Sequence, residues 1–239
     1  LADLYPSMPP PNHPMRSKSY SLLALALLHA DFISTVSPTY AREILTSEYG
    51  AGLETVLQTR ADKLRGIING IDYQEFNPGR DPHLAASYDT STLELRSKNK
   101  AALQKQAGLP RRAGAPVLGM VGRLAEQKGV DLVTQAMGHI LQNSDTQFVW
   151  LGTGEEKYKQ QVIQAIAPYQ ERAKLIPTFD LALAQLIYAG SDLFLMPSRY
   201  EPCGLGQLIA LRYGSIPVVR RTGGLADTIQ DCPSDLSTG

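Results

Sequence analysis

Short apolar runs separated by turn residues dominate the first third of the chain. Each run is ended by a residue that stops regular structure, so the runs predict short elements. The predicted elements are a buried helix at 22–30, a strand at 32–37 before Pro38, a helix at 39–46 and a strand at 64–68 before Asn69. The stretch 71–89 has little periodicity, and its scattered Pro, Gly, Asp and Asn predict a linker and surface loop before a new domain.

A regular alternation of strand and helix patterns begins near residue 98. Strands are predicted at 116–121, 147–151, 173–179, 193–196 and 216–219. Helical spacing of apolar residues is found at Val130, Val133, Met137, Ile140 and Leu141, and again at Tyr158, Val162, Ile163 and Ile166. Strand–helix–strand units of this length make right-handed crossovers. We therefore expect an α/β fold, a Rossmann-like parallel sheet with helices on both faces.

Composition and charge narrow the class of protein. The chain is 43% hydrophobic and 19% charged, which is typical of soluble globular proteins, and its 23 basic and 23 acidic residues balance. This balance argues against a generally basic protein that binds nucleic acid. The apolar run at 22–30 is about half of the roughly 20 residues that span a bilayer, so we expect no membrane partner. The two cysteines, Cys203 and Cys232, lack C-x-x-C spacing and favour free thiols in a reducing cytoplasm.

The loops that leave the carboxyl ends of the strands form the ligand-binding edge of such a sheet. After the first predicted strand, Arg123 and Lys128 precede a helix start, an arrangement that suits a diphosphate and equally suits a solvated charged loop. After the next strand, Gly152 and Gly154 allow a ligand to approach the backbone, although ordinary strand-to-helix turns look similar. For Phe179, at the end of the third strand, core packing is the default and stacking on a base is the alternative.

The loop after the fourth strand carries the strongest signal. Pro202 fixes a tight turn that presents the Glu201 carboxylate rigidly at the ligand edge. The amides of Gly204, Leu205 and Gly206 lie at the start of a helix, where they are free to receive an anion. A Glu near a helix start is also a common capping residue. We favour the functional interpretation because Pro, Cys and Gly crowd the same turn.

The strand, turn and helix at 216–228 repeat this pattern, with Thr222 and Gly223 at the turn, although the basic residues there suit solvent equally well. Together these loops describe a pocket for a doubly charged leaving group. We see no D-x-D pair that would bind Mg²⁺ on a diphosphate, and we therefore expect no metal and no other cofactor. Arg123 and Lys128 would supply the positive charge instead.

Several longer motifs resemble those of the bacterial-type glycogen and starch synthases, glycosyltransferases of family 5. They are V-S-P-T-Y-A-R-E-I at 36–44, N-G-I-D at 69–72, R-L-x-x-Q-K-G at 123–129, P-S-R-Y-E-P-C-G-L at 197–205 and R-T-G-G-L-x-D-T at 221–228. The resemblance covers nearly the whole chain from about residue 30. It implies a GT-B fold of two Rossmann-like domains. It also implies transfer of glucose from ADP-glucose to an α-1,4-glucan acceptor with retention at the anomeric carbon, although the sequence does not distinguish ADP-glucose from UDP-glucose.

The resemblance also implies roles for individual residues. Arg123 and Lys128 would bind the diphosphate and stabilise its charge as the nucleotide leaves. Glu201 would contact the glucosyl ring, and Phe179 would stack on the base. The predicted donor-binding set is completed by Gly152, Gly154, Cys203, Gly204, Leu205, Gly206, Thr222 and Gly223.

The chain departs from the family pattern at its amino-terminal side, where the K-x-G-G-L motif is absent. We expect 1–75 to be the end of the acceptor-side domain with its linker, and 76–239 to be a truncated donor-binding domain. Such a fragment should be inactive, or nearly so, on its own. A cytoplasmic location is expected, or the plastid stroma for a plant or algal source. The oligomeric state stays open.

Two alternative functions conflict with particular residues, and a third does not. A sucrose-synthase-like transferase commonly carries a second Glu eight residues after the first, where this chain has Ile209. A nicotinamide-dependent dehydrogenase requires G-x-G-x-x-G, but the sequence from residue 122 is G-R-L-A-E-Q. A non-catalytic module that binds nucleotide sugar or glucan stays compatible with the sequence.

Overall fold

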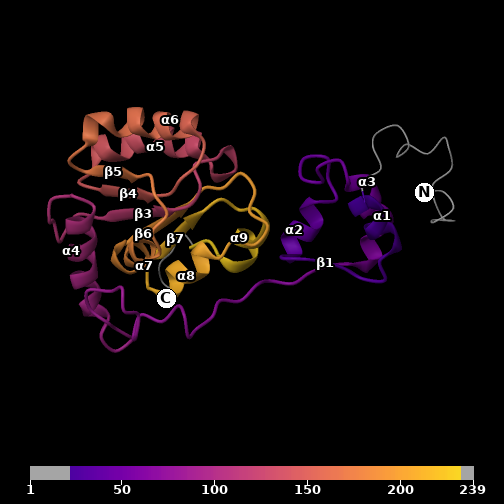
Figure 1. Ribbon diagram of the computed structural model, residues 1–239, viewed down its shortest axis with the longest axis horizontal. Helices are drawn as coiled ribbons and strands as arrows, with labels where there is room; N and C mark the ends of the chain where they lie inside the picture. The colour runs from indigo at the N-terminus through magenta and orange to yellow at the C-terminus, as the bar shows by residue number, and fades with distance from the viewer. Residues whose placement is uncertain (1–21, 233–239) are drawn as a thin grey trace.

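The computed structural model describes residues 22–232. The first part contains α1 (Leu22–His29), β1 (Ile33–Thr35), α2 (Pro38–Glu43), α3 (Glu54–Thr59), η2 (Ala61–Lys63) and β2 (Leu64–Gly66). The second contains η3 (Leu93–Leu95), α4 (Arg96–Gln106), β3 (Val117–Val121), η4 (Glu126–Lys128), α5 (Val130–Asn143), β4 (Gln147–Leu151), α6 (Glu156–Ile166), η5 (Ala167–Tyr169), β5 (Ala173–Ile176), α7 (Leu181–Gly190), β6 (Leu193–Met196), α8 (Gly206–Arg212), β7 (Ile216–Val219) and α9 (Gly223–Thr228). Figure 1 shows the two parts side by side.

The second part is built on a five-stranded parallel sheet with the order β5-β4-β3-β6-β7. The chain enters the middle of the sheet at β3, moves outward to β5, and then returns to the other side of β3 for β6 and β7. This order is that of a doubly wound Rossmann fold, with its switch point between β3 and β6. The predicted parallel sheet is confirmed, and the carboxyl ends of β3 and β6 lie next to each other where such sheets bind ligands.

Helices cover both faces of the sheet: α5 and α6 lie on one face, and α4, α7 and α8 on the other (Figure 1). Successive residues of a strand point to opposite faces. Val117 of β3 and Val149 of β4 enter the core beneath α4 and α7, whereas Leu118 and Phe148 enter the core beneath α5 and α6. Because both faces are buried, the strands read as continuous apolar runs rather than as alternating patterns.

Two details of these elements differ from expectation. β5 ends at Ile176 rather than at 179, because Pro177 has no N–H to offer the ladder and the Thr178 amide turns back to the Ile176 carbonyl at 2.9 Å. In α6, Val162 and Ile166 are buried as predicted, but Ile163 is 39% exposed. The helical apolar spacing therefore overestimates the width of the buried face of α6.

The first part is a smaller unit in which β1 and β2 pair in parallel. Ile33, Ala41 and Leu64 form its buried core. The prediction of a buried helix at 22–30 is wrong, since among the residues of α1 only Ala24 is buried. The apolar side chains of α1 point to all sides of the helix, and the small unit built on β1 and β2 covers only one of these sides. No helix within 22–232 is long and apolar enough to cross a membrane.

The stretch 71–89 is packed more closely than a surface loop. Tyr213 donates a hydrogen bond from its hydroxyl to Asp81 at 2.6 Å, and Tyr88 donates one to the Tyr213 carbonyl at 2.7 Å. Burial is the main cause that raises the pKa of Tyr88 to about 12. Since Asp81 and Tyr88 are both buried, the expectation of a surface loop is wrong for this part of the stretch.

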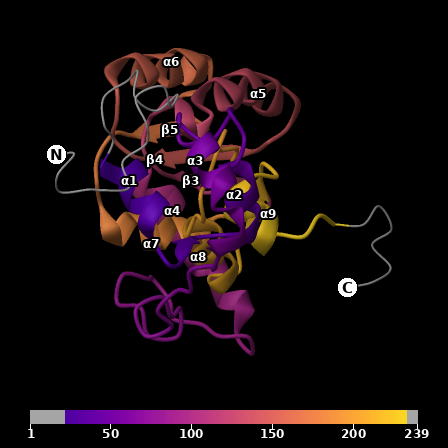
Figure 2. The ribbon, with the colours of Figure 1, turned by 90° about the vertical axis from the view of Figure 1, so that its right-hand side faces the viewer.

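The two parts contact each other through α2 and α9, which both views place side by side (Figures 1 and 2). At the first turn of α2, Thr39 donates to the Asp227 carboxylate of α9 from its amide at 2.9 Å and from its hydroxyl at 2.6 Å. Burial opposes the charge on Asp227, but the bonds from Thr39 outweigh it, and the pKa of Asp227 is lowered. The contact joins residues that lie 188 positions apart in the sequence.

Candidate functional site

The loops after β3 and β6 meet at the switch point of the sheet. Gly129 has a left-handed φ of 68°, and a Cβ there would lie 2.4 Å from the Pro197 carbonyl oxygen, so only glycine allows this close approach. The Arg199 amide donates to the Gln127 carbonyl at 2.8 Å. The two loops are therefore held against each other at this edge of the sheet.

Glu201 and Lys128, which lie on different loops, form an ion pair. The Lys128 ammonium lies 2.5 Å from Glu201 Oε2, and the side chains are 18% and 9% exposed. The Ser198 hydroxyl donates to the same oxygen at 2.9 Å. Glu201 Oε1 accepts no hydrogen bond within the described residues, so the carboxylate is held by one oxygen and presents the other. The sequence argument did not assign a role to Ser198, although its position three residues before Glu201 was a usable signal.

Arg123 lies at the same edge but is exposed. Its guanidinium donates to the side-chain oxygen of Gln127 at 3.2 Å, and the Gln127 amide nitrogen donates to the Tyr200 carbonyl at 3.2 Å. Within residues 22–232, no carboxylate lies at ion-pair distance from Arg123. The two expected cations therefore differ. Lys128 is ion-paired with Glu201, whereas Arg123 has no carboxylate partner among the described residues.

Free backbone amides complete this edge. Gly204 has a φ of 72° and turns the chain after Glu201 into α8, whose first residue is Gly206. Among the described residues, nothing accepts a hydrogen bond from the amides of Cys203, Gly204, Leu205 or Gly206. The expectation of unpaired amides beside the carboxylate therefore agrees with the geometry, and their contact with an anion stays a prediction.

The glycines of the second loop have a different neighbour from the one expected. A Cβ on Gly152 would lie 1.8 Å from the Gly122 carbonyl oxygen, and one on Gly154 would lie 2.2 Å from that of Leu124. The loop that carries Arg123 thus occupies the space next to both glycines. The need for glycine here comes from this contact within the chain, and a direct contact of Gly152 or Gly154 with a ligand stays a prediction.

Thr222 and Gly223 are also occupied within the chain. The Thr222 hydroxyl donates to Glu43 at 3.0 Å, and the Gly223 amide donates to both oxygens of the same carboxylate at 3.0 and 3.1 Å. In this structure the Glu43 carboxylate accepts the hydrogen bonds of both groups, and contact of Thr222 and Gly223 with a ligand stays a prediction. Sequence reasoning could not find Glu43, which lies 180 positions from Gly223.

Phe179 is 81% exposed and lies between the end of β5 and the start of α7. The default expectation of core packing is therefore wrong. Asp180, the next residue, caps α7 by accepting a hydrogen bond from the Leu183 amide at 2.9 Å, which fixes the backbone beside the ring. An aromatic face held open to solvent at the ligand edge suits stacking.

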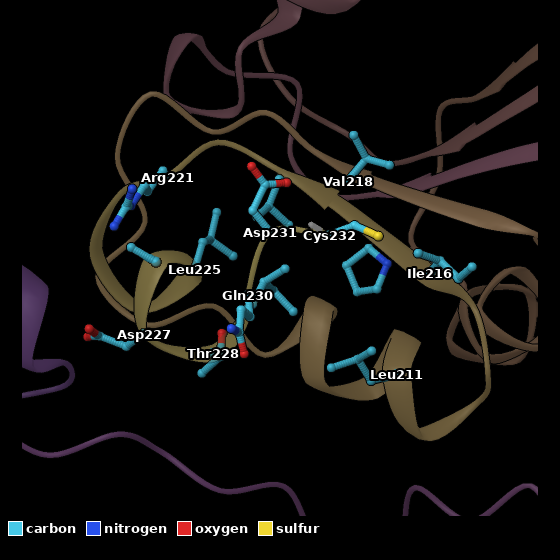
Figure 3. Close-up of a pocket in the computed structure, with 14 residues that line it drawn as sticks. Leu211, Ile216, Val218, Arg221, Leu225, Asp227, Thr228, Gln230, Asp231 and Cys232 are labelled. Carbon is cyan, nitrogen blue, oxygen red and sulfur yellow. The ribbon is translucent and has the colours of Figure 1, made fainter. Parts of the chain in front are cut away.

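A cavity lies elsewhere on the second part of the chain. It has a volume of about 1000 Å³ and runs along β7 and α9, with Leu211, Ile216, Val218 and Leu225 among its lining residues (Figure 3). Arg123, Lys128 and Glu201 do not line it. The candidate site is thus an open edge of the sheet rather than this cavity. Within 22–232, no group of three or more His, Cys, Asp or Glu side chains could bind a metal ion.

Comparison with known proteins identifies the family of the chain. Residues 115–236 match the family model of glycosyl transferases group 1, and residues 5–59 match that of the starch synthase catalytic domain. A glycogen synthase from Kosmotoga olearia is 52% identical over 217 residues, which cover 91% of this chain and 45% of that protein. A glycogen synthase from Bacillus subtilis is 47% identical over 219 residues, covering 92% of this chain and 45% of the relative. The chain spans less than half the length of these relatives.

A solved structure agrees with this result. The catalytic domain of starch synthase IV from Arabidopsis thaliana, bound to ADP and acarbose, matches with a TM-score of 0.83 and 40% identity. The match covers 90% of this chain and 44% of that one. The expected GT-B type of fold and the resemblance to glycogen and starch synthases are thereby confirmed. The chain belongs to the glycosyl transferases group 1 family, and its relatives within that family are glycogen and starch synthases.

Proposed function

We propose that the whole protein is a glucosyltransferase that extends an α-1,4-glucan from ADP-glucose with retention at the anomeric carbon, and that this chain supplies the donor side. One observation carries the proposal: the Glu201 carboxylate, held by Lys128 and Ser198, lies at the switch point beside an unpaired guanidinium and free amides. We place the boundary between the acceptor-side part and the donor-binding domain near residue 75.

The proposed reaction breaks the bond between the glucosyl C1 and the diphosphate oxygen. The electron pair leaves with the diphosphate, where Arg123 and the amides of 203–206 stabilise the growing negative charge. The acceptor hydroxyl oxygen forms the new bond to C1 on the same face of the sugar, and its proton passes to the departing phosphate oxygen. Glu201 presents Oε1 to the glucosyl ring and orients it during this exchange.

Binding of ADP to this chain tests the donor site. Isothermal titration is expected to show millimolar or tighter binding, weakened roughly 10–150-fold by Arg123→Ala, because a hydrogen bond to a charged group contributes about 1.5–3 kcal/mol. Lys128→Ala should also weaken binding. Arg111→Ala is the matched control, since this exposed arginine lies at the amino-terminal edge of the sheet, before β3. Equal losses in the Arg111 and Arg123 variants would indicate non-specific charge attraction.

The same titration tests the expected metal independence. Affinity for ADP should be the same in EDTA as in magnesium if Arg123, Lys128 and the amides provide the charge stabilisation without a metal ion. A large gain in affinity with magnesium would contradict the metal-free site. A cytoplasmic location stays a prediction.

Phe179→Ala is expected to weaken ADP binding by about 1–3 kcal/mol, the size of a base–aromatic stacking contact. The ring is exposed, so its removal leaves no cavity in the core and should leave the stability of the chain nearly unchanged. Leu181→Ala is the control, because Leu181 is an exposed aliphatic side chain in the same turn. Comparable losses in both variants would assign the effect to general apolar contact, and comparison of ADP with UDP would show how far the base is selected.

A further inference from the structure

The main chain of Glu201 is fixed by the first turn of α9. The Gly224 amide donates to the carbonyls of Glu201 and Pro202, at 3.1 Å each. Gly223 is so close that a Cβ there would lie 2.0 Å from the Glu201 carbonyl oxygen. Since the carboxylate is bound separately by Lys128 and Ser198, the residue is held at both ends, and a shift of the α9 turn must be transmitted to Glu201.

This turn of α9 is bound by a residue from the other part of the chain. Glu43, the last residue of α2, accepts two hydrogen bonds from the Gly223 amide and one from the Thr222 hydroxyl. A negative charge at a helix start is favourable because the first amides have no partner within the helix. Tyr40, also in α2, has a raised pKa, caused first by burial and then by the charges of Tyr200 and Glu43.

We propose that Glu43 is a positioning residue for Glu201, acting through the first turn of α9. The acceptor-side part of the chain would thereby set the orientation of the donor-side carboxylate. The contacts run from Glu43 to Gly223, and from Gly224 to the Glu201 main chain. The inference rests on the proposed function only for the role of Glu201, because the contacts themselves do not depend on it.

Amide hydrogen exchange of the full chain, followed by NMR, tests the coupling. Glu43→Ala is expected to speed exchange at Gly224 about tenfold relative to the buried amides of β4, which report global opening. Asp227→Ala is the matched control, because it removes the other polar link between α2 and α9 without touching Gly223. It should change the relative exchange at Gly224 by less than about threefold.

Conservative variants keep the test valid if the alanine variants fold poorly. Glu43→Gln retains an acceptor but loses the charge, and about threefold faster exchange is expected at Gly224, with no change in Asp227→Asn. A second readout is the carboxyl ¹³C resonance of Glu201, assigned with Glu201→Gln. It is expected to shift in the Glu43 variants and not in the Asp227 variants.

Three results would overturn the proposal. They are equal acceleration at Gly224 in the Glu43 and Asp227 variants, acceleration that the β4 amides share, and an unchanged Glu201 resonance. Each would mean that Glu43 only joins the two parts of the chain. Titration with ADP separates this outcome from failure of the proposed function, since a chain that shows the coupling but binds no ADP refutes the donor site alone.

Discussion

Glucosyl transfer by the whole protein is expected to fall roughly 10²–10⁴-fold when Glu201 is replaced by Gln, while the affinity for ADP changes by less than about threefold. The reason is geometric. Glu201 Oε2 is bound to Lys128 and Ser198, so the carboxylate is held rigidly, and the proposed function places the sugar rather than the nucleotide at its other oxygen. Gln keeps the shape and a hydrogen bond acceptor but loses the negative charge.

The measurement is steady-state turnover at saturating donor, together with isothermal titration of ADP. Glu126→Gln is the control, because Glu126 is an exposed carboxylate in the neighbouring loop and should leave both quantities unchanged. A collapse of ADP affinity with unchanged turnover at saturation would show that Glu201 binds the nucleotide and does not act on the sugar. The stability of the Gln variant should be followed in parallel, since part of the ion pair with Lys128 is lost.

The second large effect concerns stability. Trp150→Ala is expected to lower the free energy of unfolding by about 3–5 kcal/mol, because it removes a large side chain from the core between the sheet and the helices α5 and α6. Trp150 is fully buried, packs edge-to-face on Phe148 with ring centroids 6.3 Å apart, and donates from its indole nitrogen to the Gly122 carbonyl at 3.2 Å. Gly122 precedes Arg123, so the loss should also loosen the loop that carries the free cation.

This change is measured by denaturant unfolding followed by far-UV circular dichroism. Tryptophan fluorescence is unsuitable, because Trp150 is the only tryptophan of the chain. Trp150→Phe separates packing from the hydrogen bond, and a loss of about 1–2 kcal/mol is expected for it. A loss below about 1 kcal/mol in Trp150→Ala would contradict the tight packing of this core.

Much of the sheet could be predicted from the sequence because parallel strands buried on both faces read as plain apolar runs. The strands around Val117, Phe148 and Phe194 all follow this rule. Their alternation with helices then predicts that Arg123 and Glu201 lie at one edge of the sheet. Burial of α1 was mispredicted by the same reasoning, because an apolar run shows what a segment prefers but not what is available to cover it.

The finer parts of the site depend on contacts that no local pattern encodes. A glycine at position 152 indicates that another group approaches the backbone closely, but only the structure shows that this group is the Gly122 carbonyl. The exposure of Phe179 depends on where Pro177 ends β5. The carboxylate of Glu43 reaches Gly223 across 180 positions, and such a pairing is set by how the two parts of the chain pack.

The contact between Thr39 and Asp227 also has a consequence for synthesis on the ribosome. The residues are 188 positions apart, and at roughly 5–20 residues per second the ribosome needs about 10–40 s to make the intervening chain. During that time α2 has been made, but α9, the helix that it packs against, has not. The polar contact between α2 and α9 can therefore form only after α9 has left the ribosome.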